Sequence, residues 1–313
     1  MSKRSLRIEY GAYLAELGAR NPDIVVLEGD LKASTQSVRF QEAFPDRYFD
    51  VGVAEQNMVG IAAGLSLSGK IPFAHSFACF ISMRALDQVR TTVAYPRLNV
   101  KFVVSHGGIS AGSAGTTHHS TEDIAIMRAI ANMTVLVPGD VAEMKQVVEA
   151  ALNLDGPVYI RLSAADVEDV YGPNDRFVVG KATTLATGDD AAIITTGTLA
   201  YEGICAAKRL REEDHLRVRV LQMASVKPLD AAAVLAAAEE TGRIVTVEEH
   251  NILGGLGGAV SEIAGEIGKA RIRRIGIRDC FCGVGTASYL MKENGLTVEN
   301  IVEAVKKLLE RKV

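Results

Sequence analysis

The chain has 313 residues, of which 48% are hydrophobic, and its formal net charge is −4 at pH 7. This apolar content is ample for buried cores and excludes a disordered chain. The weakly negative charge, without a basic cluster interleaved with aromatic residues, argues against nucleic acid as a partner. At roughly 150 residues per domain, the length favours two domains.

The N-terminus and the cysteines exclude several further classes of protein. Basic residues open the chain, but no apolar stretch follows them, so they do not indicate a secretory signal. No apolar run approaches the length that spans a bilayer. Cysteines 79, 205, 280 and 282 are too few and too uneven for a disulfide framework, and the last two lack the second ligand pair of a zinc site. We expect a cytoplasmic protein with reduced thiols and no membrane partner.

Short, nearly continuous apolar runs alternate with longer helical segments in the first half of the chain. Such runs predict parallel strands covered on both faces. The predicted strands are residues 24–27, 71–74, 100–104, 134–137 and 157–162. A strand-like Val51-Gly-Val53 leads into a predicted buried helix at 54–67. Asp140 and Glu143 predict a capping box that begins another helix.

The second half repeats the alternation after a change of composition. Turn-forming clusters at 172–175 and 188–190 favour a linker. The strands predicted beyond it are residues 191–196, 218–221, 244–247 and 272–275, followed by a final helix at 298–309. The sequence therefore predicts an α/β fold with two consecutive, mostly parallel-sheet domains, 1–165 and 189–313, joined by a linker at 166–188.

Glu55 is the first candidate for a functional residue. It is predicted to begin the buried helix at 54–67, at the carboxyl end of a strand, and ligands favour that edge of a parallel sheet. Position alone favours a simpler role, in which a glutamate at a helix start complements the helix dipole. The very low polarity of the helix that Glu55 begins weakens this simpler interpretation.

Two further segments carry candidate chemistry. Phe77 and Phe80 could stack on a flat heterocycle, although ordinary core packing explains such a pair equally well. The segment 105–119, which we call the histidine loop, carries three histidines among small residues that allow close approach to a ligand. A metal site there is disfavoured because the adjacent His118 and His119 would point apart. The alternative is a flexible surface loop.

Together these segments resemble the C-terminal half of transketolase, which comprises a pyrimidine-binding domain and a small C-terminal domain. The resemblance spans essentially the whole chain. The segments that carry it are Glu28-Gly-Asp-Leu31, Val51-Gly-Val-Ala-Glu-Gln-Asn-Met58, Ser76-Phe-Ala-Cys-Phe80, Ser105-His106, Gly115-Thr-Thr-His118, Lys227-Pro-Leu-Asp230 and Val247-Glu-Glu-His250.

The resemblance implies thiamine diphosphate as cofactor and a role for several residues around its pyrimidine ring. Glu55 matches the acid that shares a proton with the ring nitrogen, and Phe77 and Phe80 match the aromatic pocket of the pyrimidine. Met83 stands where transketolases often place a third aromatic residue, and a thioether still packs against a ring edge. Asp30 resembles a residue close to the cofactor.

The resemblance also implies a substrate site. His118 matches the histidine that faces the reacting carbon, which makes it the second catalytic residue beside Glu55. Arg7, Ser34 and His106 match positions that contact the substrate phosphate, and Arg161 lies close to the position of a phosphate-binding arginine.

In that family, a different domain holds the diphosphate and its metal ion through a Gly-Asp-Gly motif. This sequence contains no Gly-Asp-Gly. The resemblance therefore implies a split enzyme, in which an N-terminal transketolase subunit supplies the diphosphate site and its Mg²⁺ or Ca²⁺, and this chain supplies no metal ligand. The expected assembly is a heterotetramer with a homodimer of this chain inside it.

Two departures bear on the substrate. Ala114 stands where transketolases carry an aspartate that contacts a sugar hydroxyl. Ala164 stands where they carry a phosphate-binding arginine. Loss of a bidentate arginine removes a strong anion contact, so we expect a sugar pair other than the usual pentose phosphates. The resemblance implies an enzyme that transfers a two-carbon ketol unit from a ketose (phosphate) to an aldose acceptor. Three alternatives to this function stay open: a 2-oxo acid dehydrogenase beta-type subunit, a deoxyxylulose-phosphate synthase role, and a non-catalytic regulatory subunit.

Overall fold

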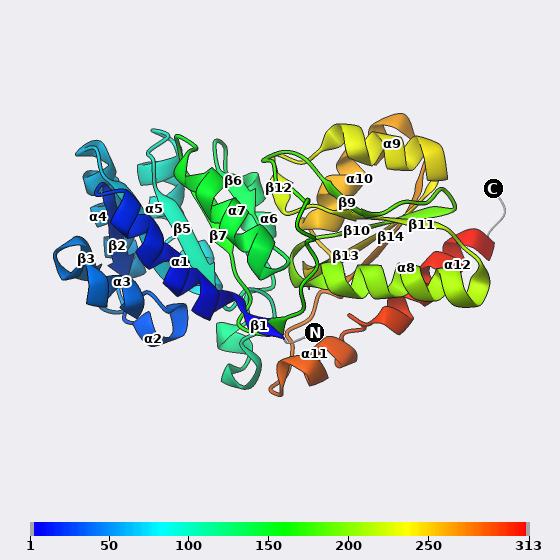
Figure 1. Cartoon of the computed structure of the whole chain (residues 1–313), viewed down its shortest axis with the longest axis horizontal. Coiled ribbons are helices and arrows are strands. Elements are labelled where there is room, and N and C mark those ends of the chain that lie inside the picture. The colour runs from blue at the N-terminus through cyan, green and yellow to red at the C-terminus, as the bar shows by residue number, and fades with distance from the viewer. Residues whose placement is uncertain (1–2, 311–313) are drawn as a thin grey trace.

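The computed structural model describes residues 3–310 and contains two α/β units that lie side by side (Figure 1). The N-terminal unit is built on a seven-stranded sheet with the strand order β12-β6-β7-β5-β4-β2-β3. Its strands are parallel except β12, which pairs antiparallel with β6. The strands are β2 (Ile24–Glu28), β3 (Tyr48–Asp50), β4 (Ile71–Phe77), β5 (Lys101–Ser105), β6 (Thr134–Leu136), β7 (Val158–Arg161) and β12 (Ser225–Lys227).

Helices cover both faces of this sheet, and each face has its own apolar core. One core packs the sheet against α1 (Leu6–Arg20), α3 (Val38–Ala43) and α7 (Val141–Leu152). The other packs it against α4 (Glu55–Leu67), η2 (Phe80–Arg84), α5 (Leu86–Gln88), η3 (Val89–Ala94) and α6 (Asp123–Ala129). Burial on both faces explains why the strands read as continuous apolar runs.

The C-terminal unit repeats this plan on a five-stranded sheet with the order β14-β13-β10-β11-β9, in which only β9 is antiparallel. Its strands are β9 (Thr183–Ala186), β10 (Ala191–Thr195), β11 (Val218–Gln222), β13 (Arg243–Asn251) and β14 (Arg271–Ile277). One face packs on α8 (Ala200–Asp214) and α12 (Val298–Glu310), and the other packs on α9 (Ala231–Thr241) and α10 (Leu256–Ile267) (Figure 1).

Smaller elements join the two units. β1 (Arg4–Ser5) pairs antiparallel with β8 (Asp166–Val167), which ties the start of the chain to the segment between the sheets. α2 (Lys32–Thr35) follows β2, and α11 (Ala287–Glu293) precedes α12. None of the helices between residues 3 and 310 combines the length and apolar character needed to span a bilayer.

The predicted α/β fold with two mostly parallel sheets is confirmed, and each predicted apolar run overlaps an observed strand. The capping box is also confirmed, since Asp140 Oδ1 accepts a hydrogen bond from the Glu143 amide at 2.7 Å. The expectation of strand structure at Val51-Gly-Val53 was wrong. The strand ends at Asp50 because Gly52 adopts φ = +74°, and its amide donates to the Asp50 carboxylate at 3.1 Å.

Two strands, β9 and β12, belong to sheets other than those expected from their place in the sequence. β9 lies inside the segment 166–188, yet it pairs with β11 of the C-terminal sheet. β12, from the second half of the sequence, forms an edge of the N-terminal sheet. The boundaries 1–165, 166–188 and 189–313 therefore stay a prediction.

The close approach of α1 and α3 yields a test of the packing. A Cβ added at Gly18 of α1 would overlap the ring of Phe40, whereas one added at Gly265 of α10 would meet no atom within 4 Å among residues 3–310. Gly18→Ala should therefore lower the free energy of unfolding by about 1–3 kcal/mol through overpacking. Gly265→Ala should leave it unchanged or raise it by up to about 1 kcal/mol. Urea unfolding of the two variants measures both values, and a stabilised Gly18→Ala would contradict this packing.

Candidate functional site

The candidate residues gather at one edge of the N-terminal sheet. β2, β4 and β5 are adjacent parallel strands, and their ends are aligned, with Glu28 opposite His75 and Phe77 opposite Ser105. The segments that follow these strands therefore leave the sheet at the same carboxyl edge, where parallel α/β sheets bind ligands. They carry Asp30, Phe80 and the histidine loop.

Glu55 begins α4 at this edge, and its side chain is buried with only 1% of the residue exposed. Its Oε1 accepts a hydrogen bond from Ser76 Oγ at 2.9 Å, and its Oε2 accepts one from Arg84 Nη1 at 2.7 Å. A Cβ added at Gly29 would lie 3.6 Å from Oε1, so the turn after β2 packs against the same carboxylate. A glutamate that only complemented a helix dipole would stay in solvent. This one is enclosed by three separate segments.

The two phenylalanines and two histidines form one aromatic cluster. The rings of Phe77 and Phe80 stack with centroids 5.8 Å apart and an angle of 15° between their planes. His106 lies on Phe77 with centroids 3.9 Å apart, and His118 meets Phe80 edge-on at 5.5 Å. Within the described residues, neither phenylalanine belongs to the two apolar cores of this unit. The pair packs with two histidines at the sheet edge, outside these two cores, and its role in binding a flat ring stays a prediction.

His106 is uncharged near neutral pH. Burial, together with the smaller effects of Arg7 and His118, lowers its pKa to about 4. Its Nδ1 lies 2.9 Å from Ser105 Oγ, and its backbone is left-handed with φ = +59°. A neutral imidazole at this place offers a hydrogen bond but no positive charge.

Glu28 organises the turn that carries Asp30 and Ser34, a role that no pattern in the sequence had indicated. Its Oε1 accepts from the Gly29 and Leu31 amides at 3.0 and 3.3 Å. Its Oε2 accepts from the hydroxyls of two further residues of the same turn, Thr35 at 2.6 Å and Ser37 at 2.5 Å. Burial raises the pKa of Glu28 to about 7. Four donors on one buried carboxyl fix the turn beside the site.

The structure brings Arg7 and Ser34 together, and their contact with a substrate stays a prediction. Arg7 Nη1 donates to the Ser34 carbonyl at 2.6 Å, and Nη2 lies 3.5 Å from the Ala164 carbonyl. The buried Nε of Arg7 has no hydrogen-bond partner among residues 3–310. An orphaned buried donor is costly, so this guanidinium has capacity for an added acceptor.

Arg161 has a different role from the one expected. It is 6% exposed, its Nε pairs with Asp123 Oδ2 at 2.8 Å, and its Nη2 donates to the carbonyls of Ser120 and Glu249. These contacts commit the guanidinium to internal partners.

Three further residues that the resemblance singled out are exposed to solvent. Asp30 is exposed and left-handed, with φ = +62°. Met83 is 47% exposed on η2, and Ala114 is exposed in the histidine loop.

The C-terminal unit holds the histidine loop in place, so this loop is not a flexible surface segment. The Ile109 amide donates to Glu249 Oε1 at 2.8 Å, and Thr116 Oγ1 donates to the Cys282 carbonyl at 2.6 Å. A Cβ added at Gly108, where φ = +67°, would overlap the Glu249 carboxylate. Only glycine permits this approach, so the loop conformation depends on both units.

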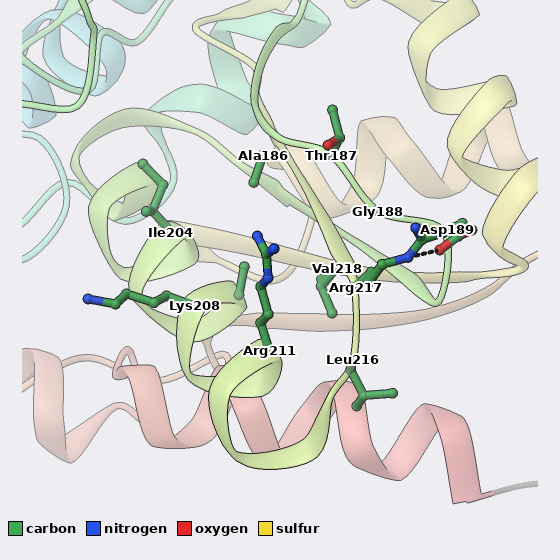
Figure 2. A pocket seen from close by; sticks show the side chains of 11 residues that line it. Ala186, Thr187, Gly188, Asp189, Ile204, Lys208, Arg211, Leu216, Arg217 and Val218 are labelled. Carbon is green, nitrogen blue, oxygen red and sulfur yellow. Dashed lines mark hydrogen bonds and ion pairs between the residues drawn. The ribbon is translucent and has the colours of Figure 1, made fainter.

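One cavity of the C-terminal unit lies apart from the candidate residues. Within residues 3–310, no three His, Cys, Asp or Glu side chains are placed to hold a metal ion. Figure 2 shows a cavity of about 480 Å³ in the C-terminal unit, where Arg217 Nε pairs with Asp189 at 3.1 Å while Lys208 and Arg211 extend from α8. None of its lining residues is a candidate site residue.

Comparison with known proteins agrees with this geometry. Residues 2–168 match the transketolase pyrimidine-binding domain, and residues 180–301 match the transketolase C-terminal domain. The 6-deoxy-6-sulfo-D-fructose transketolase subunit of Clostridium sp. (strain MSTE9) is 45% identical over 98% of this chain and 95% of its own length. An apulose-4-phosphate transketolase subunit of Phocaeicola vulgatus is 40% identical over 95% of each chain.

Solved structures show the same relationship. A split gene transketolase, described as an inactive β4 tetramer, superposes with a TM-score of 0.90 at 43% identity and covers 97% of this chain and 98% of its own. Transketolase from Leishmania mexicana superposes with a TM-score of 0.84 at 27% identity, over 99% of this chain and 46% of its own. The chain belongs to the transketolase family and corresponds to the C-terminal section of a split enzyme.

The pyrimidine-binding domain implies thiamine diphosphate as the cofactor. The side chains at the sheet edge suit its pyrimidine end, because a stacked aromatic pair and a buried carboxylate are what a flat, nitrogen-bearing ring needs.

The low pKa of His106 can be tested by NMR. Its imidazole should titrate near pH 4 and stay constant between pH 6 and 8, because burial disfavours the charged form. Since the folded-state pKa lies below the unfolded value of about 6.5, the stability linked to His106 is complete above pH 6.5 and is lost as the pH falls towards 4. His106→Asn should remove this part of the acid sensitivity. A titration midpoint near 6.5 would contradict it.

Proposed function

We propose that this chain and a diphosphate-binding partner together transfer a two-carbon ketol unit from a ketose to an aldose acceptor. The observation that carries the proposal is the buried Glu55 carboxylate beside the stacked Phe77 and Phe80. Such an arrangement binds one edge and one face of a planar ring. Across residues 3–310, no group of three His, Cys, Asp or Glu side chains is placed to hold a metal ion.

Thiamine diphosphate, when bound, supplies a carbon nucleophile that attacks a ketose carbonyl. We assign to Glu55 the exchange of a proton with the pyrimidine ring nitrogen, since its carboxyl is buried at the sheet edge and reached through Oε2. Phe77 and Phe80 orient the ring by stacking. Asp30 and Met83 border the ring on the open side.

His118 is proposed to act on the substrate. It stands edge-on to Phe80, and its Nδ1 lies 3.0 Å from Thr117 Oγ1, which orients the imidazole. A histidine so placed can exchange a proton with a substrate hydroxyl. His106, which is neutral, is proposed to contribute a hydrogen bond to the substrate.

The site needs a second chain. We propose that an N-terminal transketolase subunit binds the diphosphate and its Mg²⁺ or Ca²⁺, and that two copies of each chain form a cytoplasmic heterotetramer. A relative with 43% identity is described as an inactive β4 tetramer, which agrees with the need for a partner.

The charge of the substrate pocket favours an unusual sugar pair. Of Arg7, Ser34 and His106, only Arg7 carries a positive charge at pH 7. Ala164 adds none, and Arg161 is committed to Asp123. One cation suits an uncharged or singly charged group better than a phosphate dianion. Relatives named for 6-deoxy-6-sulfo-D-fructose and for apulose-4-phosphate show that such subunits serve different sugars.

Glu55→Gln tests the catalytic assignment. The amide keeps the shape of the side chain but cannot exchange the proton, so kcat for ketol transfer should fall by about 10²- to 10⁴-fold. The measurement uses the complex assembled with its partner, thiamine diphosphate and Mg²⁺. Glu262→Gln, a surface change on α10, is the matched control.

Assembly of the Glu55→Gln complex should stay intact, as followed by gel filtration. Full activity in this variant would remove Glu55 from the mechanism. Absence of any activity in the wild-type complex would favour the alternative of a regulatory, non-catalytic subunit.

The substrate proposal is tested by comparing kcat/KM for matched acceptors with and without phosphate. With one available cation, the two values should differ by less than about tenfold, which corresponds to about 1.4 kcal/mol. Ala164→Arg, which places a second guanidinium beside Arg7, should raise kcat/KM for the phosphorylated acceptor selectively. A large preference of the wild-type complex for ribose 5-phosphate would contradict the proposal.

A further inference from the structure

Arg84 contacts both the acid and the aromatic surface of the site. It ends η2, its Nη1 donates to Glu55 Oε2 at 2.7 Å, and its guanidinium carbon lies 4.3 Å from the centroid of the Phe80 ring. Its side chain is nevertheless 43% exposed. The guanidinium therefore stands between solvent and the two groups assigned to the pyrimidine ring.

The two oxygens of Glu55 are held in different ways. Oε1 accepts from Ser76, which is fully buried on β4, so this oxygen faces the interior of the unit. Oε2 accepts from the half-exposed Arg84 and so faces the open side. The Glu55 side chain is itself 0% exposed, so a ligand that arrives from solvent contacts Arg84 first and reaches Oε2 only when Arg84 moves away.

A guanidinium and an aminopyrimidine share the features that matter here. Both are planar and both stack on an aromatic face, and the ring nitrogen, once it has taken up a proton, presents an in-plane N–H to a carboxylate as the guanidinium does. Since each would use Glu55 Oε2 and the Phe80 ring, the two groups compete for the same place.

The cost of leaving Glu55 unpaired explains why a cation lies there. A buried carboxylate without a partner is strongly unfavourable, and the free chain has no bound ring to satisfy it. The exposure of Arg84 distinguishes this pair from a permanent one. In the Arg161–Asp123 pair the side chains are 6% and 0% exposed, whereas Arg84 can withdraw into water at small cost.

We propose that Arg84 is a displaceable substitute for the pyrimidine ring, which pairs with Glu55 and covers Phe80 in the free chain and moves away when thiamine diphosphate binds. This inference rests on the proposed function, because it assigns Glu55 and Phe80 to the ring. It makes Arg84 a positioning residue that stabilises the empty site and weakens the apparent affinity for the cofactor.

Arg84→Met tests the inference, since methionine keeps an apolar chain of similar length and removes the donors. Arg39→Met, on the exposed side of α3, is the matched control. Two quantities are measured: the urea midpoint of the free chain, and the Kd for thiamine diphosphate of the complex with its partner in the presence of Mg²⁺.

Arg84→Met should lower the midpoint of the free chain, and Glu55→Gln should largely remove this effect in the double variant, because the two residues form one pair. In the complex, Arg84→Met should lower the Kd by about tenfold, since the ring no longer displaces a competitor. Arg84→Lys, which keeps the charge but not the plane, serves if the methionine variant does not fold, and it should lower the Kd by less.

The displacement of Arg84 and the proposed function can fail separately. If the wild-type complex binds thiamine diphosphate and the Arg84 variants bind it equally or more weakly, Arg84 does not compete with the ring and the inference is overturned alone. If the wild-type complex does not bind thiamine diphosphate, the proposed function is overturned, and this inference with it.

Discussion

A buried ion pair between Arg161 and Asp123 connects the parts of this molecule on which its site depends. Arg161 ends β7, Asp123 begins α6, and the same guanidinium reaches the Glu249 carbonyl of the C-terminal unit. The Glu249 carboxylate in turn holds the Ile109 amide of the histidine loop. Removing one partner of such a pair leaves an uncompensated buried charge and typically costs about 3–5 kcal/mol. The histidine loop thus depends on contacts with the C-terminal unit.

The carboxylates around the site differ in how firmly their hydrogen-bond partners hold them. Glu28 has four donors and shapes the turn after β2, and Glu249 fixes the histidine loop. Glu55 differs because one of its oxygens is held by a half-exposed arginine. Rigid support around one adjustable group is what a binding site requires when the free and bound forms must both be stable.

Relatives that match nearly the full length of this chain differ in the sugars for which they are named. Glu55 and the phenylalanine pair, which we propose to bind the cofactor, are intact in this chain. The differences from the usual transketolase pattern, Ala114 and Ala164, lie among the residues proposed for the substrate. On this proposal, different segments of the same sheet edge carry chemistry and specificity, and the second can change without disturbing the first.

The sequence by itself determined the fold class and the approximate strands, and its resemblance to transketolase implied the cofactor. Strands buried on both faces leave continuous apolar runs, and the segment around Glu55 leaves a motif, so both are local properties of the chain. Only the tertiary structure decided the pairing of side chains. Arg161 turned inward to Asp123, and Arg84, which no motif singled out, lies on Glu55. No sequence pattern predicted that β9, in the expected linker, would join the C-terminal sheet, or that β12, in the expected C-terminal domain, would join the N-terminal sheet. These contacts join residues that are far apart in the sequence, and a local sequence pattern does not predict which of them come together in the folded chain.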